Sequence, residues 1–276
     1  MPSTPAAPGV PPEQPPLISV RGLVKRYGTK DTDRLVLDGV DLDVHKGQLV
    51  CIVGPSGAGK TTLLRCMSGL LAPTAGETVL EGVTVTAPPP ALALVFQDYS
   101  RSLMPWMSVR KNVELPLLGK QISKNERRRR ADEALAAVGL TGSRGQYPWQ
   151  LSGGMQQRVA IARALAYRPH ALIMDEPFAS VDAQTRADLE DLTLQVREMY
   201  EMTVILVTHD IDEAVYLGDE VVVLSGSPTR VRERITIDLG RSRDQLTTKS
   251  TPEFVALRGQ VLQLIRRDRY ATRTAD

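Results

Sequence analysis

Apolar and polar positions alternate in short runs along the chain, and these runs predict strands. After Leu17, ISVRGLV and LVLDGVDLDV alternate in the way that is typical of half-buried antiparallel strands. The next run, QLVCIVG, is apolar throughout, as in a strand that is covered on both faces. Runs of the same type return at 91–96, 171–175 and 203–209. Because these runs alternate with helical stretches, they predict a parallel sheet with helices on its faces.

Other segments depart from this alternation. The stretch 97–160 loses strand character, and the helical spacing in NERRRRADEALAAVGL predicts a helical subdomain inserted into the order of the sheet. Later, VVVLSGSPTRVRERITIDL predicts a hairpin, and PEFVALRGQVLQLIRRDRY predicts an amphipathic helix. Abundant proline with few residues to bury predicts a disordered tail at 1–16. We therefore expect a mainly parallel α/β core with an N-terminal antiparallel β subdomain at 17–235, and an extension at 236–276.

Composition narrows the class of protein. The chain has 276 residues, of which 42% are hydrophobic and 24% charged, as in a globular protein with a well-buried core. Its net charge of +2 does not favour a nucleic-acid partner. We interpret the run ERRRR at 126–130 as a solvated helix face, with a nucleic-acid patch as the alternative. Cys51 and Cys66 lie in apolar surroundings, which predicts core packing and a reducing compartment. With no apolar run of about 20 residues and no signal-peptide pattern, any membrane role is expected to be peripheral.

Candidate chemistry begins with GPSGAGKTT at 54–62, which follows the run QLVCIV and precedes a helical stretch. This is Gly-x-x-x-x-Gly-Lys-Thr in the strand, loop and helix context that phosphate binding requires. The glycines let successive N–H groups point inward, and the helix N-terminus favours anions. We expect Lys60 to reach the β and γ phosphates and the Thr61 hydroxyl to ligate Mg²⁺. The residues expected to bind a purine nucleoside triphosphate here are Gly54, Pro55, Ser56, Gly57, Ala58, Gly59, Lys60, Thr61 and Thr62.

Polar residues follow the other three buried runs, and in a doubly wound sheet ligands bind at the carboxyl ends of the strands. At the end of ALIMDEP, Asp175 is expected to hold Mg²⁺ and Glu176 to polarise an attacking water. His209, after VILVT, is positioned to hydrogen-bond a γ-phosphate. Gln97 follows the run at 91–96, and its amide can touch both the metal and the water. The candidate catalytic residues are Glu176, His209, Gln97 and Lys60, and the candidate metal ligands are Thr61, Gln97 and Asp175.

A second anion site is predicted at LSGGMQQR, residues 151–158. Ser152 can cap the helix that follows, and Gly153 and Gly154 expose backbone N–H groups at its start. Together with the phosphate loop, the adjacent Asp and Glu and the late histidine, in this order, the sequence resembles the nucleotide-binding subunit of an ATP-binding cassette transporter. The resemblance extends from Leu17 to about residue 235.

This resemblance implies a P-loop NTPase core, ATP and Mg²⁺ as ligands, and a homodimer with two ATP sites. In that family, the signature helix of one subunit closes over the triphosphate that the other subunit holds. Tyr27, in KRYG, would stack on the adenine, and Asp182, in SVDA, looks like the aspartate that crosses the dimer interface. The signature residues expected to contact the second subunit's nucleotide are Ser152, Gly153, Gly154 and Gln156.

Within the family, SLMPWMSVRKNV at 102–113 resembles the nitrate, sulfonate and taurine importer group, and so does the ending from IDLGRSRD to TPEFVALRGQVLQLI. That group implies an ATPase bound peripherally at the cytoplasmic face of the inner membrane, with integral permease subunits as partners and an external solute-binding protein as an indirect one. Met104, Pro105 and Trp106 would form an apolar surface for a coupling helix of the permease, unless Trp106 packs inside the helical subdomain.

Two rival functions remain as alternatives at this stage. A non-transport cassette ATPase acting on nucleic acid or ribosomes normally has a long coiled coil or two cassettes, and this chain has neither. A regulatory nucleotide-binding module without turnover would lack Glu176 or His209, and both are present. The transported solute is not written in this chain, because specificity belongs to the permease and the binding protein.

Overall fold

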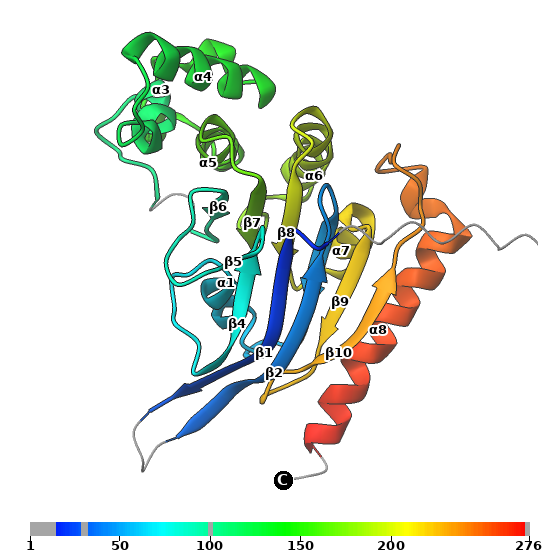
Figure 1. Cartoon of the computed structure of the whole chain (residues 1–276). Coiled ribbons are helices and arrows are strands. Elements are labelled where there is room, and N and C mark those ends of the chain that lie inside the picture. The colour runs from blue at the N-terminus through cyan, green and yellow to red at the C-terminus, as the bar shows by residue number, and fades with distance from the viewer. Residues whose placement is uncertain (1–14, 29–32, 99–101, 274–276) are drawn as a thin grey trace, which may run out of the picture.

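Two β-sheets form the frame of the chain, and helices occupy the remaining layers (Figure 1). The computed structural model describes residues 15–28, 33–98 and 102–273. The disordered tail expected at 1–16 therefore lies outside the described residues, apart from its last two positions. The fold is the expected one, a mixed α/β structure with one antiparallel and one mainly parallel sheet.

The smaller sheet is antiparallel and has the strand order β2-β1-β4-β5. The two strands expected from the alternating runs pair along their whole length, from Ile18 opposite Val44 to Tyr27 opposite Arg34. A second hairpin, between β4 and β5, was not among the predicted elements; its Gly82 has a φ of +79° and allows the tight turn. The strands are β1 Ile18–Tyr27, β2 Arg34–Val44, β4 Ala75–Leu80 and β5 Val83–Thr84.

The larger sheet has the order β10-β9-β3-β8-β7-β6, and only the β9–β10 pair within it is antiparallel. All residues of β3, β7, β8 and β9 are buried, as the apolar runs predict. The prediction is wrong for β6, where Leu92, Ala93 and Leu94 are only half-buried because β6 is an edge strand. The expected hairpin after 220 is present as β9 and β10. The strands are β3 Leu49–Val53, β6 Leu92–Val95, β7 Ala171–Asp175, β8 Thr203–Val207, β9 Glu220–Leu224 and β10 Val231–Thr236.

Helices pack around the larger sheet, and α3, α4 and α5 group together at one end of the molecule (Figure 1). On α4, Arg129 and Arg130 both pair with Glu126, so part of the basic run is neutralised on the helix itself. The α-helices are α1 Lys60–Met67, α3 Val109–Glu114, α4 Lys124–Ala137, α5 Gly153–Ala166, α6 Ala183–Met199, α7 Ile211–Leu217 and α8 Pro252–Arg273. Single 3₁₀ turns occur at Leu115–Leu117, Thr141–Ser143, Pro148–Gln150 and Thr248–Ser250.

The core consists of two apolar clusters, one on each face of the larger sheet. Successive side chains of β3 alternate between them, so that Cys51 belongs to the cluster under α3–α8 and Ile52 to the cluster shared with α1 and the smaller sheet. The amphipathic pattern of α8 places Phe254 and Val261 in the first cluster. Cys51 and Cys66 are both free thiols in the core, as expected. Among the described residues, no helix has the length and apolar character needed to span a bilayer.

Candidate functional site

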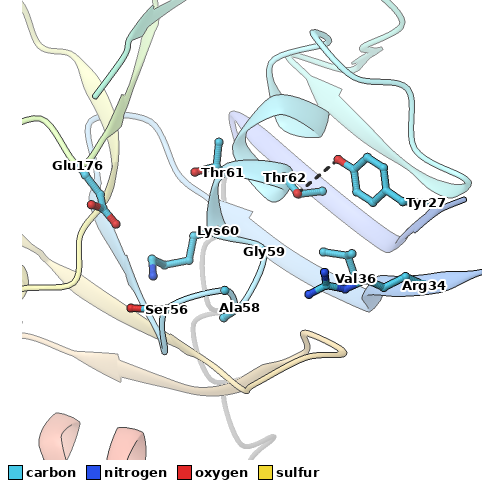
Figure 2. Close-up of a pocket in the computed structure, with 11 residues that line it drawn as sticks. Tyr27, Arg34, Val36, Ser56, Ala58, Gly59, Lys60, Thr61, Thr62 and Glu176 are labelled. Atoms are coloured by element: carbon cyan, nitrogen blue, oxygen red, sulfur yellow. Dashed lines mark hydrogen bonds between the residues drawn. The ribbon is translucent and has the colours of Figure 1, made fainter. Parts of the chain in front are cut away.

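The loop between β3 and α1 forms one wall of a cavity of about 450 Å³ (Figure 2). The loop emerges at the carboxyl end of β3, which lies between β8 and β9 and is fully buried. At Gly59, φ is +76° and an added Cβ would lie 2.7 Å from Val36 Cγ1, so only glycine fits this turn. The residues that line the cavity are Tyr27, Arg34, Val36, Ser56, Gly57, Ala58, Gly59, Lys60, Thr61, Thr62 and Glu176.

Lys60 is the buried cation of this loop. Its Nζ donates hydrogen bonds to the carbonyl oxygens of Gly54, at 3.0 Å, and Pro55, at 3.2 Å. Burial lowers the pKa of Lys60, and the nearby Glu176 and Asp175 charges act in the opposite direction. The ammonium group is therefore folded back onto its own loop, next to the free N–H groups at the start of α1, where a phosphate can take over its hydrogen bonds.

Asp175 and Thr61 lie together at the floor of the site. Thr61 Oγ1 donates to Asp175 Oδ1 over 3.4 Å, which joins the first turn of α1 to the end of β7. Asp175 is only 7% exposed, and this burial raises the pKa of its carboxyl. A buried carboxyl beside a hydroxyl is an arrangement in which a bound cation would offset the cost of burying the charge.

Glu176 contacts residues at the ends of the neighbouring strands β6 and β8, since its own strand, β7, lies between them in the sheet. It follows β7 with a φ of +43°, and its backbone N–H donates to the Val207 carbonyl at 2.8 Å. Its carboxylate Oε2 accepts a hydrogen bond from Gln97 Nε2 at 3.1 Å, and His209 Nδ1 lies 3.3 Å from the same oxygen. The structure thus brings together Gln97, Glu176 and His209, three of the four residues expected at the strand ends, and the fourth, Asp175, directly precedes Glu176.

Tyr27 lies on the side of the cavity away from Glu176 (Figure 2), and the residue is 41% exposed. Its hydroxyl lies 3.4 Å from Thr62 Oγ1, and Lys25 Nζ lies 5.4 Å from the ring centroid. Sequence reasoning missed Arg34 and Val36 in this wall. The signal for Arg34 was the register of the β1–β2 pair, which sets it opposite Tyr27, and that register depends on the length of the loop between them.

The signature segment is placed differently from the phosphate loop. Ser152 caps α5 as expected, accepting a hydrogen bond from the Met155 N–H at 3.3 Å. Gln156 Nε2 donates to two carbonyls just before the helix. No residue of 151–158 is among those that line the described cavity.

Asp182 and the signature segment are neighbours through Thr185. The Asp182 carboxylate caps α6 by accepting from the Thr185 N–H at 3.0 Å and the Thr185 hydroxyl at 2.7 Å, and these bonds lower its pKa. A Cβ on Gly154 would lie 2.3 Å from Thr185 Cγ2. The start of α5 and the Asp182 loop therefore share one tight contact.

Fold and site together define a P-loop nucleotide-binding protein: a strand, a glycine-rich loop and a helix with a buried lysine, beside carboxylates at a neighbouring strand end. Comparison with known proteins gives the family. The model of the family described as ABC transporter matches residues 37–179, which include the phosphate loop, the signature segment and Glu176. The chain belongs to the ABC transporter family, and it is an ATP-binding subunit of the ABC ATPase type.

Relatives cover almost the whole chain. An uncharacterized ABC transporter ATP-binding protein of Methanocaldococcus jannaschii is 45% identical over 249 residues, 90% of this chain and 91% of that protein. The bicarbonate transport ATP-binding protein CmpD of Synechococcus elongatus is 39% identical over 267 residues, 96% of this chain and 94% of that protein. Among solved structures, a dimeric ATP-binding cassette in a post-hydrolysis state, bound to ADP and Pi, has a TM-score of 0.70 and 32% identity, covering 80% of this chain and 99% of its own.

Proposed function

We propose that this chain is the ATP-hydrolysing subunit of an ABC importer, in which ATP-driven dimerisation energises the uptake of a small solute. The observation that carries the proposal is the convergence of Gln97 and His209 on one oxygen of Glu176, at the edge of a cavity lined by the phosphate loop. A binding module without turnover has no use for such a constellation, whereas hydrolysis needs a water-orienting carboxylate and a donor to phosphate.

The triphosphate would lie along the loop, from Tyr27 to Glu176 (Figure 2). Tyr27 offers an exposed ring face for the adenine. Lys60 would exchange its two carbonyl contacts for the β and γ phosphates, and the glycines from Gly54 to Gly59 would present N–H groups to them. Positioning and charge stabilisation are most of what phosphoryl transfer requires.

Thr61, Asp175 and Gln97 would hold Mg²⁺. A hydroxyl, a buried carboxylate and an amide oxygen are the hard oxygen donors that this ion accepts alongside phosphate oxygens and water. When bound, the ion supplies neutralisation of the phosphate charge. Among the described residues no group of three or more His, Cys, Asp or Glu could ligate a metal by itself.

For hydrolysis, Glu176 would orient the attacking water and accept its proton. Gln97 donates to Oε2 of Glu176 and so holds that carboxylate, and His209, whose Nδ1 lies beside the same oxygen, would donate to the γ-phosphate. The charge that develops on the phosphate would be stabilised by Lys60 from this chain and by the N–H groups of a signature helix from a second copy.

The position of the signature segment supports a dimer. No residue of 151–158 lines the cavity of its own chain, and Ser152 and Gly153 are exposed, so the start of α5 is open to a second copy. The related cassette with bound ADP and Pi is dimeric. We propose a head-to-tail pair in which these residues cover the partner's nucleotide and Asp182 lies at the interface.

Permease subunits are the proposed membrane partners, at the cytoplasmic face of the inner membrane. Trp106 is 71% exposed and Pro105 is also exposed, so this tryptophan is not packed inside the helical region.

The alternative of a nucleic-acid function has less support, because two arginines of the ERRRR run, Arg129 and Arg130, form ion pairs with Glu126. Nitrate, a sulfonate or taurine fits the resemblance of the 102–113 segment, and the relative named for bicarbonate transport adds that anion; an external binding protein would deliver the solute.

The proposal is tested by Glu176→Gln, which keeps the side-chain shape and loses the charge. ATP turnover should fall by about 100-fold or more, while ATP still binds through Lys60 and Thr61. Size exclusion with light scattering should then show an ATP-dependent dimer in the presence of Mg²⁺. Adding Ser152→Arg, which puts bulk at the start of α5, should return the variant to monomers.

Glu198→Gln is the matched control, because Glu198 is an exposed carboxylate of α6 that does not line the cavity. It should turn over ATP like the unchanged chain. Undiminished hydrolysis by Glu176→Gln would refute the role of this carboxylate. A variant that stays monomeric with ATP, both alone and crosslinked within the assembled transporter, would refute the dimer.

Met104 and Trp106 test the membrane partner. Replacing both by serine should abolish copurification with the permease, because it removes the apolar surface that a coupling helix would contact. Leu246→Ser is the control, since Leu246 is an even more exposed apolar residue, at 81%, far along the chain. Circular dichroism checks that the variants fold. Normal assembly of the double variant would show that the pair is not the docking surface.

A further inference from the structure

His209 has little packing to hold its ring in place. The imidazole is 59% exposed, and Nδ1 lies 3.3 Å from Glu176 Oε2. The side chain follows β8 and precedes α7, so the backbone of 208–210 sets where the ring can be. Whatever fixes that turn therefore sets the distance between His209 and Glu176.

The turn is fixed mainly by Asp210, whose two carboxylate oxygens have separate tasks. Oδ1 accepts from the N–H groups of Asp212, at 2.9 Å, and Glu213, at 3.2 Å, and so caps α7. The Asp210 N–H donates to Thr208 Oγ1 at 3.0 Å. Oδ2 accepts from Arg186 Nη1 at 3.3 Å, which ties the turn to α6.

Arg186 reaches from this turn to the Asp182 loop. It lies in the first turn of α6, where its backbone N–H donates to the Asp182 carbonyl at 2.9 Å. Its Nη2 donates to the Val181 carbonyl at 3.4 Å while Nη1 holds Asp210. One guanidinium therefore bridges two loops. In the proposed function, the loop with Asp182 lies at the dimer interface and the loop with His209 lies at the reacting phosphate.

The surroundings of Arg186 leave this bridge able to adjust. Within the described chain, the buried Nε of Arg186 and the buried Oε1 of Glu213 have no hydrogen-bond partner. Burial, with the charges of Glu190 and Asp210, raises the pKa of Glu213 well above its ordinary value, and Arg186 acts against this. The unpartnered Nε is a spare donor, with which Arg186 can keep its contact to Asp210 if Val181 shifts.

We propose that Arg186 is a positioning residue for ATP hydrolysis: through Asp210 it holds His209 against Glu176, and through Val181 it makes that position depend on the Asp182 loop. The inference rests on the proposed function, in which His209 acts at the phosphate and Asp182 meets a second copy. It gives dimer closure a physical route to the catalytic histidine of the same chain.

The first test is steady-state ATPase of Arg186→Gln in the 276-residue chain. The turnover number should fall on the order of 10-fold, because the ring of His209 is no longer held against Glu176. The KM and the directly measured Kd for ATP should stay unchanged, since no residue of 181–186 or 208–210 lines the described cavity. Arg186→Lys, which keeps the charge but not the fork, should recover part of the turnover.

Arg197→Gln is the matched control on the same helix. Arg197 also pairs with an aspartate, Asp219, and with a backbone carbonyl, that of Gly47, and its side chain is the more buried of the two, at 18% exposed against 32%. A purely structural contribution of α6 arginines predicts equal losses of turnover in both variants. If Arg186 is a positioning residue, ATP turnover falls in Arg186→Gln and not in Arg197→Gln, even when the two variants have equal thermal stability.

A double-mutant cycle with His209→Ala decides the route. If Arg186 acts through His209, adding Arg186→Gln to His209→Ala should change the residual turnover by less than about twofold. A further tenfold loss in that background would overturn the inference. If Arg186→Gln does not fold, Asp210→Asn cuts the same ion pair and keeps the Oδ1 cap, and it enters the same cycle.

The arms also separate this inference from the proposed function. Full turnover of His209→Ala overturns the inference together with the proposed role of His209 at the phosphate, whereas ATP hydrolysis itself is tested separately by Glu176→Gln. A strong defect of His209→Ala beside a normal Arg186→Gln overturns the inference alone. Equal defects in Arg186→Gln and Arg197→Gln, or a raised Kd for ATP, overturn it as well.

Discussion

The N-termini of α1 and α5 both have glycine at or next to the first residue of the helix, yet the two helices are capped in different ways. At α1 the cap is Gly59, which has no side chain to satisfy the free N–H groups, and a cavity lies in front of it. At α5 the cap is Ser152, whose hydroxyl accepts from the Met155 N–H, and the first turn packs against Thr185. Losing a capping hydrogen bond costs a helix about 1 kcal/mol. The first helix therefore gains most from an anion, and the second is stable without one.

The phosphate loop at α1 therefore forms a site within one chain, whereas the start of α5 would form a site only together with a second copy. The phosphate loop has its own cation, Lys60, its own hydroxyl, Thr61, and an aromatic wall, Tyr27. The start of α5 lies outside the cavity of its own chain and is pressed instead against the Asp182 loop. Binding energy should therefore depend on the first region and turnover on both, and variants of each should differ in which quantity they change.

Lys60→Ala should give the largest effect, a loss of ATP turnover of about 100-fold or more, because it removes the positive charge closest to the β and γ phosphates. Lys46→Ala is the control, an exposed lysine just before β3 at the opposite end of the strand. Steady-state ATPase measures both variants, with circular dichroism as a check on folding. A folded Lys60→Ala protein with normal turnover would contradict the phosphate-loop assignment.

Gly154→Ala should come next, with turnover about tenfold lower and the Kd for ATP unchanged. The new Cβ would lie 2.3 Å from Thr185 Cγ2, so Thr185 and the Asp182 loop must move. Thr185→Ser removes that methyl group and keeps the hydroxyl that donates to Asp182. The double variant should recover most of the turnover. No recovery would mean that the glycine serves the second copy directly and not its own Asp182 loop.

Tyr27→Ala should give the smallest effect, a Kd for ATP weaker by about 1 kcal/mol, roughly fivefold, through lost stacking. Tyr27→Phe should bind as the unchanged chain does, because the hydroxyl has only a long contact of 3.4 Å with Thr62. Isothermal titration calorimetry measures both. An equal loss in the two variants would assign the role of Tyr27 to its hydroxyl.

The sequence predicts correctly that the candidate catalytic residues at the strand ends lie close together, because the apolar runs before them form parallel strands of one sheet. Gln97, Glu176 and His209 each follow an apolar run, and parallel neighbours necessarily bring such positions to one edge. The edge position of β6 was not predictable, because an apolar run does not tell whether a strand has one neighbour or two. The hairpin of β4 and β5 did have a signal, Glu81 and Gly82 between alternating valines and threonines.

The remaining site residues depend on register and on long-range packing. Arg34 and Val36 enter the cavity only because β2 pairs with β1 in one particular register. In the sequence, nothing distinguishes Arg186 from other helix arginines; its pairing with Asp210 depends on the contact between α6 and α7. Such roles arise from pairs of residues far apart in the chain, and a single sequence does not record those pairings.

The two buried thiols make the chain convenient for spectroscopy. Cys51 is fully buried and Cys66 is 2% exposed, and burial raises the pKa of both, most strongly for Cys51. Modification by a maleimide requires both access and a thiolate, and neither residue offers them. A single cysteine introduced on the surface can therefore carry a spin label or fluorophore with the native cysteines left in place. Distances between two labelled copies would then follow their association and release through a round of ATP hydrolysis.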